Sequence, residues 1–255
     1  MPDSTYFKDV TLLITHYNRS LSLKRLLDSF KALNCNFEHI IVSDDCSKPE
    51  HLEKLRDWQS EYHFELISTK KNKGLANNLN KGQDAVKTSY TLYVQEDFVP
   101  KILFPEKLSQ AVCFMNEKSE LDIVRFYAYF KYPYLKPFRD GFSEMIFSIF
   151  KTGYKKFYFY SDHPHLRRST FLQKFGRYIE GINSDQAEYK MMMTFLKRKG
   201  TGLFYVCFTE LFDQLNSDEE PSTVHRNNLR ESNNFFIKTA RHLYRHLKFN
   251  FDFIR

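Results

Sequence analysis

Tyr90-Thr-Leu-Tyr-Val-Gln-Glu-Asp-Phe-Val-Pro100 places two adjacent acids, Glu96 and Asp97, directly behind a run of β-branched and aromatic residues. Residues 91–94 predict a short strand, because such side chains fit a pleated, buried surface. In an open α/β sheet, ligands bind just beyond the carboxyl ends of the strands, and a pair of carboxylates there is a natural seat for a hard divalent cation. A solvated acidic turn explains the pair equally well when it is considered alone.

The residues before this stretch alternate between strand-like and helix-like patterns. Val10-Thr-Leu-Leu-Ile-Thr15 is almost entirely apolar, which is typical of a strand buried on both faces. Leucine and phenylalanine between residues 23 and 33 recur at helical spacing, with Ser20 or Ser22 as the expected N-cap. The alternation predicts a doubly wound, mostly parallel α/β sheet. Its further elements are predicted as strands at 39–43 and 64–68 and as helices at 49–62 and beginning within residues 70–82.

Three polar loops follow the predicted strands, at residues 15–20, 44–47 and 95–98. Because the carboxyl ends of parallel strands lie along one edge of a sheet, we expect these loops to converge there and to form a nucleotide site. Each loop has a plainer explanation. The acids of the second loop could cap the following helix, and the Asn-Lys-Gly sequence at 72–74 could be an ordinary turn. The ordered set of loops is harder to explain in this way.

The composition indicates a folded domain with an anionic partner. The chain has 255 residues, of which 42% are hydrophobic, and carries a formal net charge of +7. This charge suits a nucleotide, a nucleic acid or an anionic membrane. We expect no nucleic acid, because the basic residues are spread along the chain and are not gathered around aromatic side chains. The four cysteines form no C-x-x-C pair, which argues against structural zinc and against a disulfide framework.

The sequence lacks several motifs that would indicate secretion, a membrane span or another class of nucleotide-binding enzyme. The N-terminus does not resemble a signal peptide, and no apolar run approaches the roughly 20 residues of a membrane span. We therefore expect a cytoplasmic protein. The sequence has neither a Gly-x-Gly-x-x-Gly motif after the first strand nor a P-loop motif, which speaks against dinucleotide oxidoreductases and P-loop NTPases.

Four ordered motifs resemble the nucleotide-sugar half of family 2 glycosyltransferases with the GT-A fold. They are Thr15-His-Tyr-Asn-Arg19, Asp44-Asp-Cys-Ser47, Asn72-Lys-Gly74 with Asn80-Lys-Gly82, and Gln95-Glu-Asp97. The resemblance covers the first 100 residues and, more loosely, residues 160–200. His16 is a departure, because the family often has proline or a small residue at that place.

The resemblance implies one GT-A domain over residues 1–234, with a nucleotide-sugar half at 1–100 and an acceptor half at 101–234, followed by a C-terminal segment at 235–255. It also implies a donor site for a nucleotide-diphosphate sugar at the strand ends, in which the acids of the second loop would hold base and ribose. The implied nucleotide-sugar-binding residues are Thr15, Tyr17, Asn18, Arg19, Asp44, Asp45, Asn72, Gly74, Asn78, Gln95, Glu96 and Arg168.

A divalent cation, Mg²⁺ or Mn²⁺, is implied by the Asp-x-Asp motif of the family, with Asp97, Glu96 and His225 as its ligands. Here Gln95 replaces the first acid of that motif, and an amide is a poorer cation ligand than a carboxylate. Metal independence is therefore an open alternative. The family often has a further metal ligand late in its sequence, and Gln214 is a second candidate for that ligand beside His225.

The second half has predicted elements of less regular pattern. Residues 131–156 contain an apolar patch, Met145-Ile-Phe-Ser-Ile-Phe150, which we interpret as packing on the sheet in preference to an acceptor-side flap or a membrane contact. Strands are predicted at 121–130, 157–160 and 202–208, and helices at 169–175 and from the stretch 180–190 to about residue 199. The loop at 161–168 supplies candidates for phosphate or acceptor contacts, namely His163, His165, Arg167 and Arg168.

Ser184-Asp185 occupies the place of the family's Glu-Asp pair, so Asp185 is implied as the general base. An inverting transfer needs one carboxylate that takes the proton of the acceptor hydroxyl. Capping of the following helix by Ser184 or Asp185 is the plainer explanation, and the two roles are compatible. Glu180 and Asp162 are the alternatives for the base.

The C-terminal segment is predicted as a basic amphipathic helix with an aromatic end. Docking of its apolar stripe on the sheet is the commoner fate of such a helix, whereas the aromatic end favours contact with an anionic membrane. The apolar stripe contains Phe236, Ala240, Leu243, Tyr244 and Leu247, the basic stripe Lys238, Arg241, Arg245 and Lys248, and the aromatic end Phe249, Phe251 and Phe253.

These patterns and the resemblance together predict an inverting glycosyltransferase. It would move a sugar from a nucleotide-diphosphate sugar to a hydroxyl of a glycan or lipid-linked acceptor, in surface polysaccharide synthesis at the inner face of a membrane. One alternative is a nucleotidyltransferase, although that class normally has a Gly-rich loop after its first strand. The other is a non-catalytic sugar or nucleotide binder whose metal site has decayed.

Overall fold

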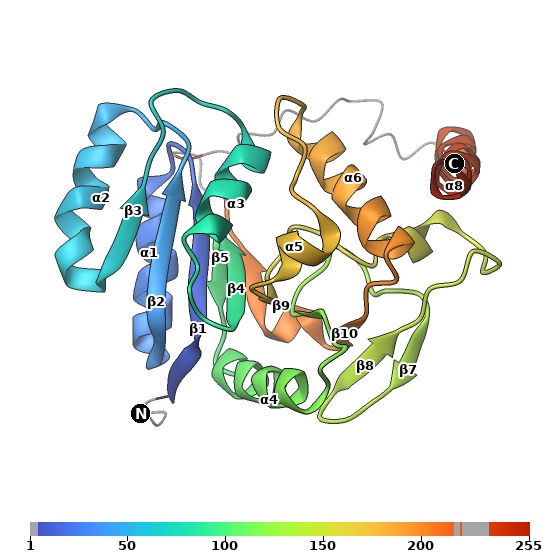
Figure 1. Cartoon of the computed structure of the whole chain (residues 1–255), viewed down its shortest axis with the longest axis horizontal. Coiled ribbons are helices and arrows are strands. Elements are labelled where there is room, and N and C mark those ends of the chain that lie inside the picture. The colour runs from blue at the N-terminus through green and yellow to red at the C-terminus, as the bar shows by residue number, and fades with distance from the viewer. Residues whose placement is uncertain (1–4, 217–219, 221–234) are drawn as a thin grey trace.

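The computed structural model describes residues 5–216, 220 and 235–255, and is a mixed α/β structure built on one large sheet (Figure 1). The strands are β1 (Thr5–His16), β2 (Cys35–Asp44), β3 (Phe64–Ile67), β4 (Tyr90–Gln95), β5 (Phe98–Pro100), β6 (Ile123–Arg125), β7 (Leu135–Pro137), β8 (Phe142–Met145), β9 (His165–Arg168), β10 (Gly202–Tyr205) and β11 (Phe212–Gln214). The helices are α1 (Ser20–Ala32), α2 (Pro49–Tyr62), α3 (Leu75–Asp84), α4 (Phe104–Glu117), α5 (Phe171–Phe175), α6 (Ser184–Lys197) and α8 (Phe235–Ile254), with 3₁₀ turns η1 (Tyr154–Phe157) and η2 (Phe208–Glu210).

Among the described residues, nine strands form the large sheet in the order β3-β2-β1-β4-β9-β6-β10-β8-β7, and β5 pairs with β11 separately. The first half is parallel throughout, because β1 pairs with both β2 and β4, and β2 pairs with β3. Antiparallel pairs enter with β9, which lies between β4 and β6. The doubly wound, mostly parallel sheet predicted from the sequence is confirmed.

Strand β1 lies in the middle of the parallel half because both of its faces are apolar. Leu12 and Ile14 point into a core that α1, α2 and α4 cover, whereas Leu13 points into a second core on the opposite face. Helices α3, α5, α6 and α8 contribute to the second core (Figure 1). The sheet therefore has helices on both faces, as an almost continuous apolar strand requires.

The aromatic run at 157–160 is not a strand, contrary to the prediction. Phe157 ends a 3₁₀ turn, and Phe157, Phe159 and Tyr160 are all buried in the second core. The strand lies instead at His165–Arg168, inside the segment predicted as a loop, and the strand predicted at 121–130 spans Ile123–Arg125 alone. Aromatic side chains favour strands through burial, and an irregular buried segment satisfies the same preference.

The start of α1 also differs from the prediction. Neither Ser20 nor Ser22 is the N-cap; Arg19 holds that position without a side-chain cap. The carboxylate of Glu220 accepts hydrogen bonds from the backbone N–H groups of Leu21 and Ser22, at 2.9 and 2.8 Å. An acid distant in the sequence thus satisfies the free N–H groups and complements the helix dipole.

The segment 131–156 forms the β7–β8 hairpin at the sheet edge and a loop that returns to η1. Met145 and Tyr154 are buried, which agrees with the predicted packing on the sheet. Ile146 and Phe150 of the predicted patch are exceptions, since 39% and 94% of their surfaces are exposed. The loop is held to α8, because the ammonium of Lys156 donates to the carbonyl oxygen of Lys151 (2.6 Å) and to Asn250 Oδ1 (3.1 Å).

Helix α8 confirms the predicted amphipathic helix, which continues through the aromatic end of the chain. Phe249 is buried against Phe157 and Tyr189, and Phe253 contacts Phe147 at a ring distance of 5.0 Å. One face of the helix is therefore part of the second core. In the part of the chain that the structure describes, no helix is both long enough and apolar enough to cross a membrane.

Gly82 explains why the second Asn-x-Gly motif needs glycine. It lies on the face of α3 that packs on the sheet, and a Cβ atom there would come within 2.5 Å of Leu13 Cδ1 and 3.0 Å of Ser43 Cβ. Both neighbours are fully buried in β1 and β2. The missing side chain lets α3 approach the two strands whose ends carry the polar loops.

We predict that Gly82→Ala lowers the free energy of unfolding by about 1–2 kcal/mol. Alanine favours the helix by up to about 1 kcal/mol over glycine, but overpacking of a close-packed core costs about 1–3 kcal/mol. Urea unfolding followed by circular dichroism measures the difference. Ser60→Ala on the exposed part of α2 is the control that adds helix propensity without overpacking. An unchanged or raised stability of Gly82→Ala would contradict the close packing of α3.

Candidate active site

The ends of three parallel strands meet at one edge of the sheet. His16 of β1 is in register with Asp44 of β2, and Thr15 is in register with Gln95 of β4. The loops at 15–20, 44–47 and 95–98 are consequently neighbours, as the sequence predicts. Their side chains can be considered as one site.

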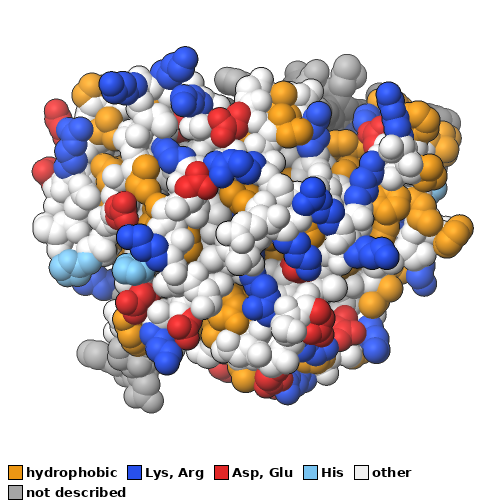
Figure 2. Space-filling model, in the orientation of Figure 1, with side chains coloured by type: hydrophobic (Ala, Val, Ile, Leu, Met, Phe, Trp, Pro, Cys, Tyr) orange, Lys and Arg blue, Asp and Glu red, His pale blue; other side chains and the backbone are white. Residues whose placement is uncertain are grey.

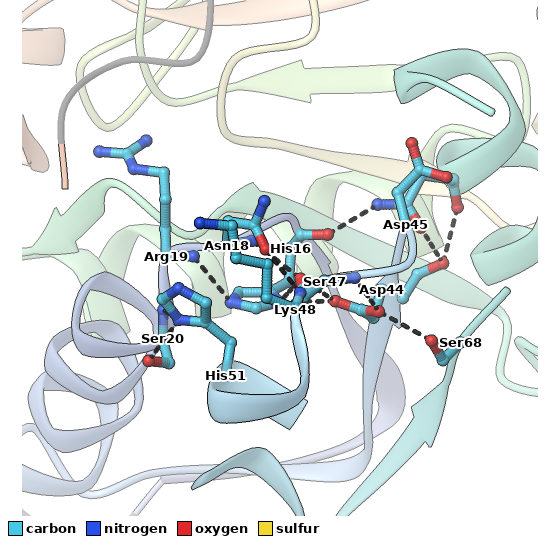
Figure 3. A network of polar contacts seen from close by, with 12 residues as sticks. His16, Asn18, Arg19, Ser20, Asp44, Asp45, Ser47, Lys48, His51 and Ser68 are labelled. Carbon is cyan, nitrogen blue, oxygen red and sulfur yellow. Dashed lines mark hydrogen bonds and ion pairs between the residues drawn. The ribbon is translucent and has the colours of Figure 1, made fainter. Parts of the chain in front are cut away.

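A hydrogen-bond network centred on Asp44 joins the first two loops (Figure 3). The ring of His16 contacts Asp44 through Nδ1 at 2.8 Å, while its Nε2 accepts from the backbone N–H of Arg19 at 3.2 Å. Nδ1 therefore carries the hydrogen and donates a hydrogen bond to the carboxylate of Asp44. Ser47 and Ser68 donate to Asp44 as well. Burial alone would raise the pKa of Asp44, but these hydrogen bonds outweigh it and lower the pKa to about 2.

This network holds the loops and is not a nucleophilic triad. Ser47 and Asp44 both approach Nδ1 of His16, and Nε2 is already occupied by a backbone N–H group. No ring nitrogen is left to accept a proton from the serine hydroxyl. His16, the departure from the family pattern, thus has a structural reason.

Asp45 shapes the turn that precedes α3. Its two oxygens accept the backbone N–H groups of Lys73 and Gly74, at 2.8 and 2.7 Å. Asn72 also accepts from the N–H of Gly74, whose φ of +84° suits glycine. Neither acid of the second loop caps α2, because the N-cap of that helix is Lys48.

Several further residues of the predicted donor site lie at this edge of the sheet and form hydrogen bonds within the protein. Thr15 is buried and bonds to the hydroxyl of Tyr93 at 3.0 Å, and Asn78 accepts from Ser43 at 2.7 Å. Asn18 Oδ1 accepts the N–H of Lys48. Tyr17, Gln95 and Glu96 remain partly exposed.

Arg168 lies elsewhere, and its predicted role at the donor site is corrected. It pairs with Tyr90, at the opposite end of β4 from Gln95. Its guanidinium donates to the backbone carbonyl oxygens of Leu121, Met115 and Lys118, at 2.9, 2.6 and 2.8 Å. The antiparallel direction of β9 places the arginine at the far edge of the sheet.

Arg19 faces the acid pair at the end of β4. Its Nη1 lies 3.6 Å from Glu96 Oε1 and 3.5 Å from Asp97 Oδ2; Arg19 and Asp97 are buried, and 12% of the Glu96 side chain remains exposed. Burial, followed by the charge of Asp97, raises the pKa of Glu96 to about 8, although Arg19 opposes this rise. The two carboxylates repel each other when both are ionised, and the positive charge of Arg19 reduces this repulsion.

The donor atoms at this pair fit a divalent cation. Asp97 Oδ1 is buried and has no hydrogen-bond partner among the described residues, and its other oxygen accepts from Gln214 Nε2 at 2.9 Å. A bare carboxylate oxygen beside a second acid is what Mg²⁺ or Mn²⁺ prefers. Across residues 5–216, 220 and 235–255, no three His, Cys, Asp or Glu side chains gather as a complete metal site. His225 lies outside the described residues, and Gln214 is the late residue that contacts Asp97.

Asp185 lies in the first turn of α6 and is exposed to solvent. The cap of that helix is Asn183, whose side chain accepts from the N–H of Gln186 at 2.9 Å. The helix therefore does not need Ser184 or Asp185 as its cap. Asp185 lines a groove between α6 and α8 with a volume of about 1610 Å³.

Glu188 is a candidate that the sequence reasoning missed. It follows Asp185 by three residues, lines the same groove, and accepts the backbone N–H of Asp162 at 3.1 Å. Burial, followed by the charge of Asp162, raises the pKa of Glu188 to about 8. The spacing of three residues on one helix was the signal that could have indicated it.

The two alternative bases have other partners. Glu180 accepts from Asn77 and Asn80, at 2.7 and 2.9 Å, and the first cause of its lowered pKa is the bond from Asn80. Asp162 is buried and accepts from the hydroxyls of Tyr160 and Tyr178. Burial raises the pKa of Asp162 to about 6 against these bonds. Neither carboxylate lines the groove.

Of the residues at 161–168 predicted to contact phosphate or acceptor, some are buried inside the protein and one lines the groove. Arg167 is buried and donates to Gln83 and Tyr178, and His165 is buried beside it. His163 lines the groove, and its ring lies 4.4 Å from that of Tyr129. Burial lowers the pKa of His163 to about 3, so it is neutral in the physiological range. Of these candidates, His163 alone among the described residues reaches the groove.

The comparison with protein families shows which of the protein classes suggested by the sequence this chain belongs to. A family model described as glycosyl transferase family 2 matches residues 11–176, which is more than half of the chain. The chain belongs to glycosyl transferase family 2. The match spans all four motifs at the sheet edge and β9. No curated protein sequence matches the chain.

Solved structures agree with the fold of this family 2 chain. TarS from S. aureus in complex with UDP-GlcNAc is similar with a TM-score of 0.62 at 15% identity, over 86% of this chain and 62% of that chain. The mannosyltransferase PcManGT from Pyrobaculum calidifontis in complex with GDP-Man and Mn²⁺ has a TM-score of 0.54 at 15% identity, over 96% and 65%. The chain thus spans less than two thirds of either structure, and the likeness shows the GT-A fold.

We predict that the pKa of Glu188 makes the stability of this family 2 chain pH-dependent. The folded protein keeps the proton of Glu188 up to about pH 8, whereas an unfolded glutamate loses it near its ordinary value of 4.5. Between these two pH values the unfolded chain releases a proton that the folded protein retains, so the free energy of unfolding falls as pH rises and levels off above about pH 8. Glu188→Gln should show a smaller fall between pH 5 and pH 8 than the wild type in urea unfolding.

Glu180→Gln is the matched control for this measurement. The pKa of Glu180 is lowered, so its contribution is present above the ordinary value and is lost as pH falls. This variant should keep the wild-type fall between pH 5 and pH 8. An equal slope for Glu188→Gln and the wild type would show that Glu188 is ionised in the folded protein.

Proposed function

We propose that this chain is an inverting glycosyltransferase, which moves a sugar from a nucleotide-diphosphate sugar to a hydroxyl of a glycan or lipid-linked acceptor. The observation that carries the proposal is the acid pair Glu96–Asp97, which lies beside Arg19 where the strand ends of a family 2 chain meet. Proteins of similar fold are solved with UDP-GlcNAc, with GDP-Man and Mn²⁺, and, for GalNAc-T7, with UDP, GalNAc and Mn²⁺. Surface polysaccharide synthesis is the role that this activity would serve.

The donor would bind at the edge formed by β1, β2 and β4. In this proposal the partly exposed Tyr17 would contact the base and ribose, and Asp45 would hold the turn at 72–74 beside them. Arg19, whose guanidinium lies 3.5 Å from Asp97, would neutralise charge on the diphosphate. Asp44, with both oxygens bonded inside the protein, would act by holding these loops.

Asp97 and Glu96 would hold Mg²⁺ or Mn²⁺, since Asp97 has a bare buried oxygen and a bound cation would offset the burial and the repulsion by Asp97 that raise the pKa of Glu96. Such an ion, when bound, stabilises the negative charge that develops on the departing diphosphate. Gln95 leaves the protein with two carboxylates here, so the affinity for the metal would depend strongly on the donor phosphates.

Asp185 would act as the general base of the transfer. The acceptor oxygen forms a bond to the anomeric carbon while the bond from that carbon to the diphosphate oxygen breaks, and the hydroxyl proton passes to Asp185. Attack opposite the leaving group inverts the configuration. Asp185 suits this role because it is exposed in the groove and the helix is capped by another residue.

We predict that Asp185→Asn lowers kcat by about a hundredfold or more, because asparagine keeps the size of the side chain but cannot take the proton. Release of nucleoside diphosphate from a panel of UDP-, GDP- and dTDP-sugars measures turnover, and NMR of the product reports its anomeric configuration. Glu180→Gln is the matched control and should keep wild-type turnover. Normal turnover of Asp185→Asn, or retention of configuration in the product, would contradict the proposed base.

The acceptor side supports a location at a membrane surface. Leu243, Leu247, Phe251 and Ile254 form an outward stripe on α8 whose side chains are 59–77% exposed, opposite the docked Phe249. Figure 2 shows hydrophobic side chains gathered at the end of the molecule that α8 and the neighbouring loop occupy. An apolar stripe beside basic residues can lie in the headgroup layer of an anionic membrane. We propose peripheral contact at the cytoplasmic face.

Vesicle sedimentation tests this contact. Truncation before α8 would also remove the buried Phe249, so substitutions in the outward stripe are cleaner. Leu247→Ser with Phe251→Ser should abolish sedimentation with anionic vesicles, because each buried apolar side chain contributes about 1.5–3 kcal/mol. Ile102→Ser, at a similarly exposed position before α4, should leave binding unchanged. Binding of the double variant at wild-type strength would exclude the stripe as the membrane contact.

A further inference from the structure

The groove between α6 and α8 has more basic than acidic side chains along its walls. Its volume is about 1610 Å³, and Asp185 lies at the start of the α6 wall. The basic residues of the groove are Arg125 from β6, Lys190 and Lys197 from α6, Arg241, Arg245 and Lys248 from α8, and Arg255 directly after α8. The acidic residues are Asp185, Glu188 and Asp252.

Two of the three acids add little negative charge to the groove. Asp252 is paired with Lys248 and accepts from the hydroxyl of Tyr189, so the charges of Asp252 and Lys248 cancel and the other basic residues remain. Glu188 keeps its proton near neutral pH, because burial and the neighbouring Asp162 raise its pKa. The walls away from Asp185 therefore carry net positive charge, which attracts anions into the groove.

The basic residues are distributed along the groove. Helix α6 rises about 1.5 Å per residue, so Lys197 lies about 18 Å from Asp185 along the helix. Lys190 lies between them and is exposed, as is Lys197. The wall opposite carries Arg245, whose guanidinium lies over the ring of Tyr154 at 5.4 Å. Anions could thus be held at more than one distance from the proposed base.

We propose that this groove is the acceptor subsite of the enzyme and that its acceptor is an extended chain with repeated anionic groups, phosphate or carboxylate. The inference rests on the proposed function, because it is Asp185 that ties the groove to the transfer. The acceptor hydroxyl lies at Asp185, and the negative groups that follow it lie between the lysines of α6 and the basic residues of α8. Aromatic side chains on the groove wall, such as Tyr129 and Tyr189, contact the uncharged parts of the chain.

Charge reversal on α6 tests the subsite. Lys190→Glu with Lys197→Glu changes two exposed residues of the wall, and Lys54→Glu with Lys87→Glu is the control with the same change in net charge outside the groove. Fluorescence anisotropy measures the Kd of labelled linear polyphosphate, labelled poly-glutamate and labelled neutral dextran. We expect the groove variant to bind the polyanions at least about tenfold more weakly, and the control variant to lose much less.

The outcomes separate this proposal from the proposed function. Loss of polyphosphate or poly-glutamate binding in the groove variant alone supports the subsite, and the stronger of the two probes identifies the anion. Equal loss in both variants, no loss in either, or equal binding of neutral dextran overturns it. Thermal shift with nucleoside diphosphates is measured on the same samples. A wild type that binds no nucleoside diphosphate contradicts the proposed function and leaves the anisotropy result valid by itself.

Discussion

The parallel pairing of β1 with β2 on one side and β4 on the other is the constraint on which the rest of the structure depends. It brings His16 beside Asp44 and Thr15 beside Gln95, so three loops distant in the sequence share one edge. The buried bond between His16 and Asp44 then holds the first two loops in a fixed relation. The acid pair after β4 acquires its surroundings from this arrangement, because Arg19 reaches it from the loop after β1.

Electrostatics at this edge follow from burial. The carboxylates of Asp44 and Asp45 are satisfied by hydrogen bonds within the protein. Among the described residues, Arg19 faces both Glu96 and Asp97, and the amide of Gln214 donates to Asp97. One edge of the sheet therefore contains acids that hold the loops and acids whose charge is not fully compensated. A cation would bind most favourably at Glu96 and Asp97, since its positive charge relieves the repulsion between these two carboxylates. The proposed donor site lies there for this reason.

Much of the first half could be predicted from the sequence, because each element there has a local pattern. The ends of α2 match the prediction, and the apolar run at 10–15 lies within β1, which begins five residues earlier. The second half was harder, since burial of the aromatic run at 157–160 depends on partners such as Phe195 and Phe249 that are distant in the sequence. Arg168 was misassigned because the direction of β9 cannot be read from its residues. Glu188 was missed because its raised pKa arises from Asp162 and from burial between elements.

The most direct test of the account is calorimetric titration of nucleoside diphosphates, with and without Mg²⁺ or Mn²⁺, into the wild type and Asp97→Asn. Asparagine keeps the acceptor for Gln214 but removes the charge that would hold the cation. We predict that one nucleoside diphosphate binds the wild type, that the metal strengthens this binding, and that Asp97→Asn loses about tenfold or more in affinity while its thermal unfolding is unchanged. Equal, metal-independent binding by both proteins, or no binding by the wild type, would contradict the assignment of this sheet edge as the donor site.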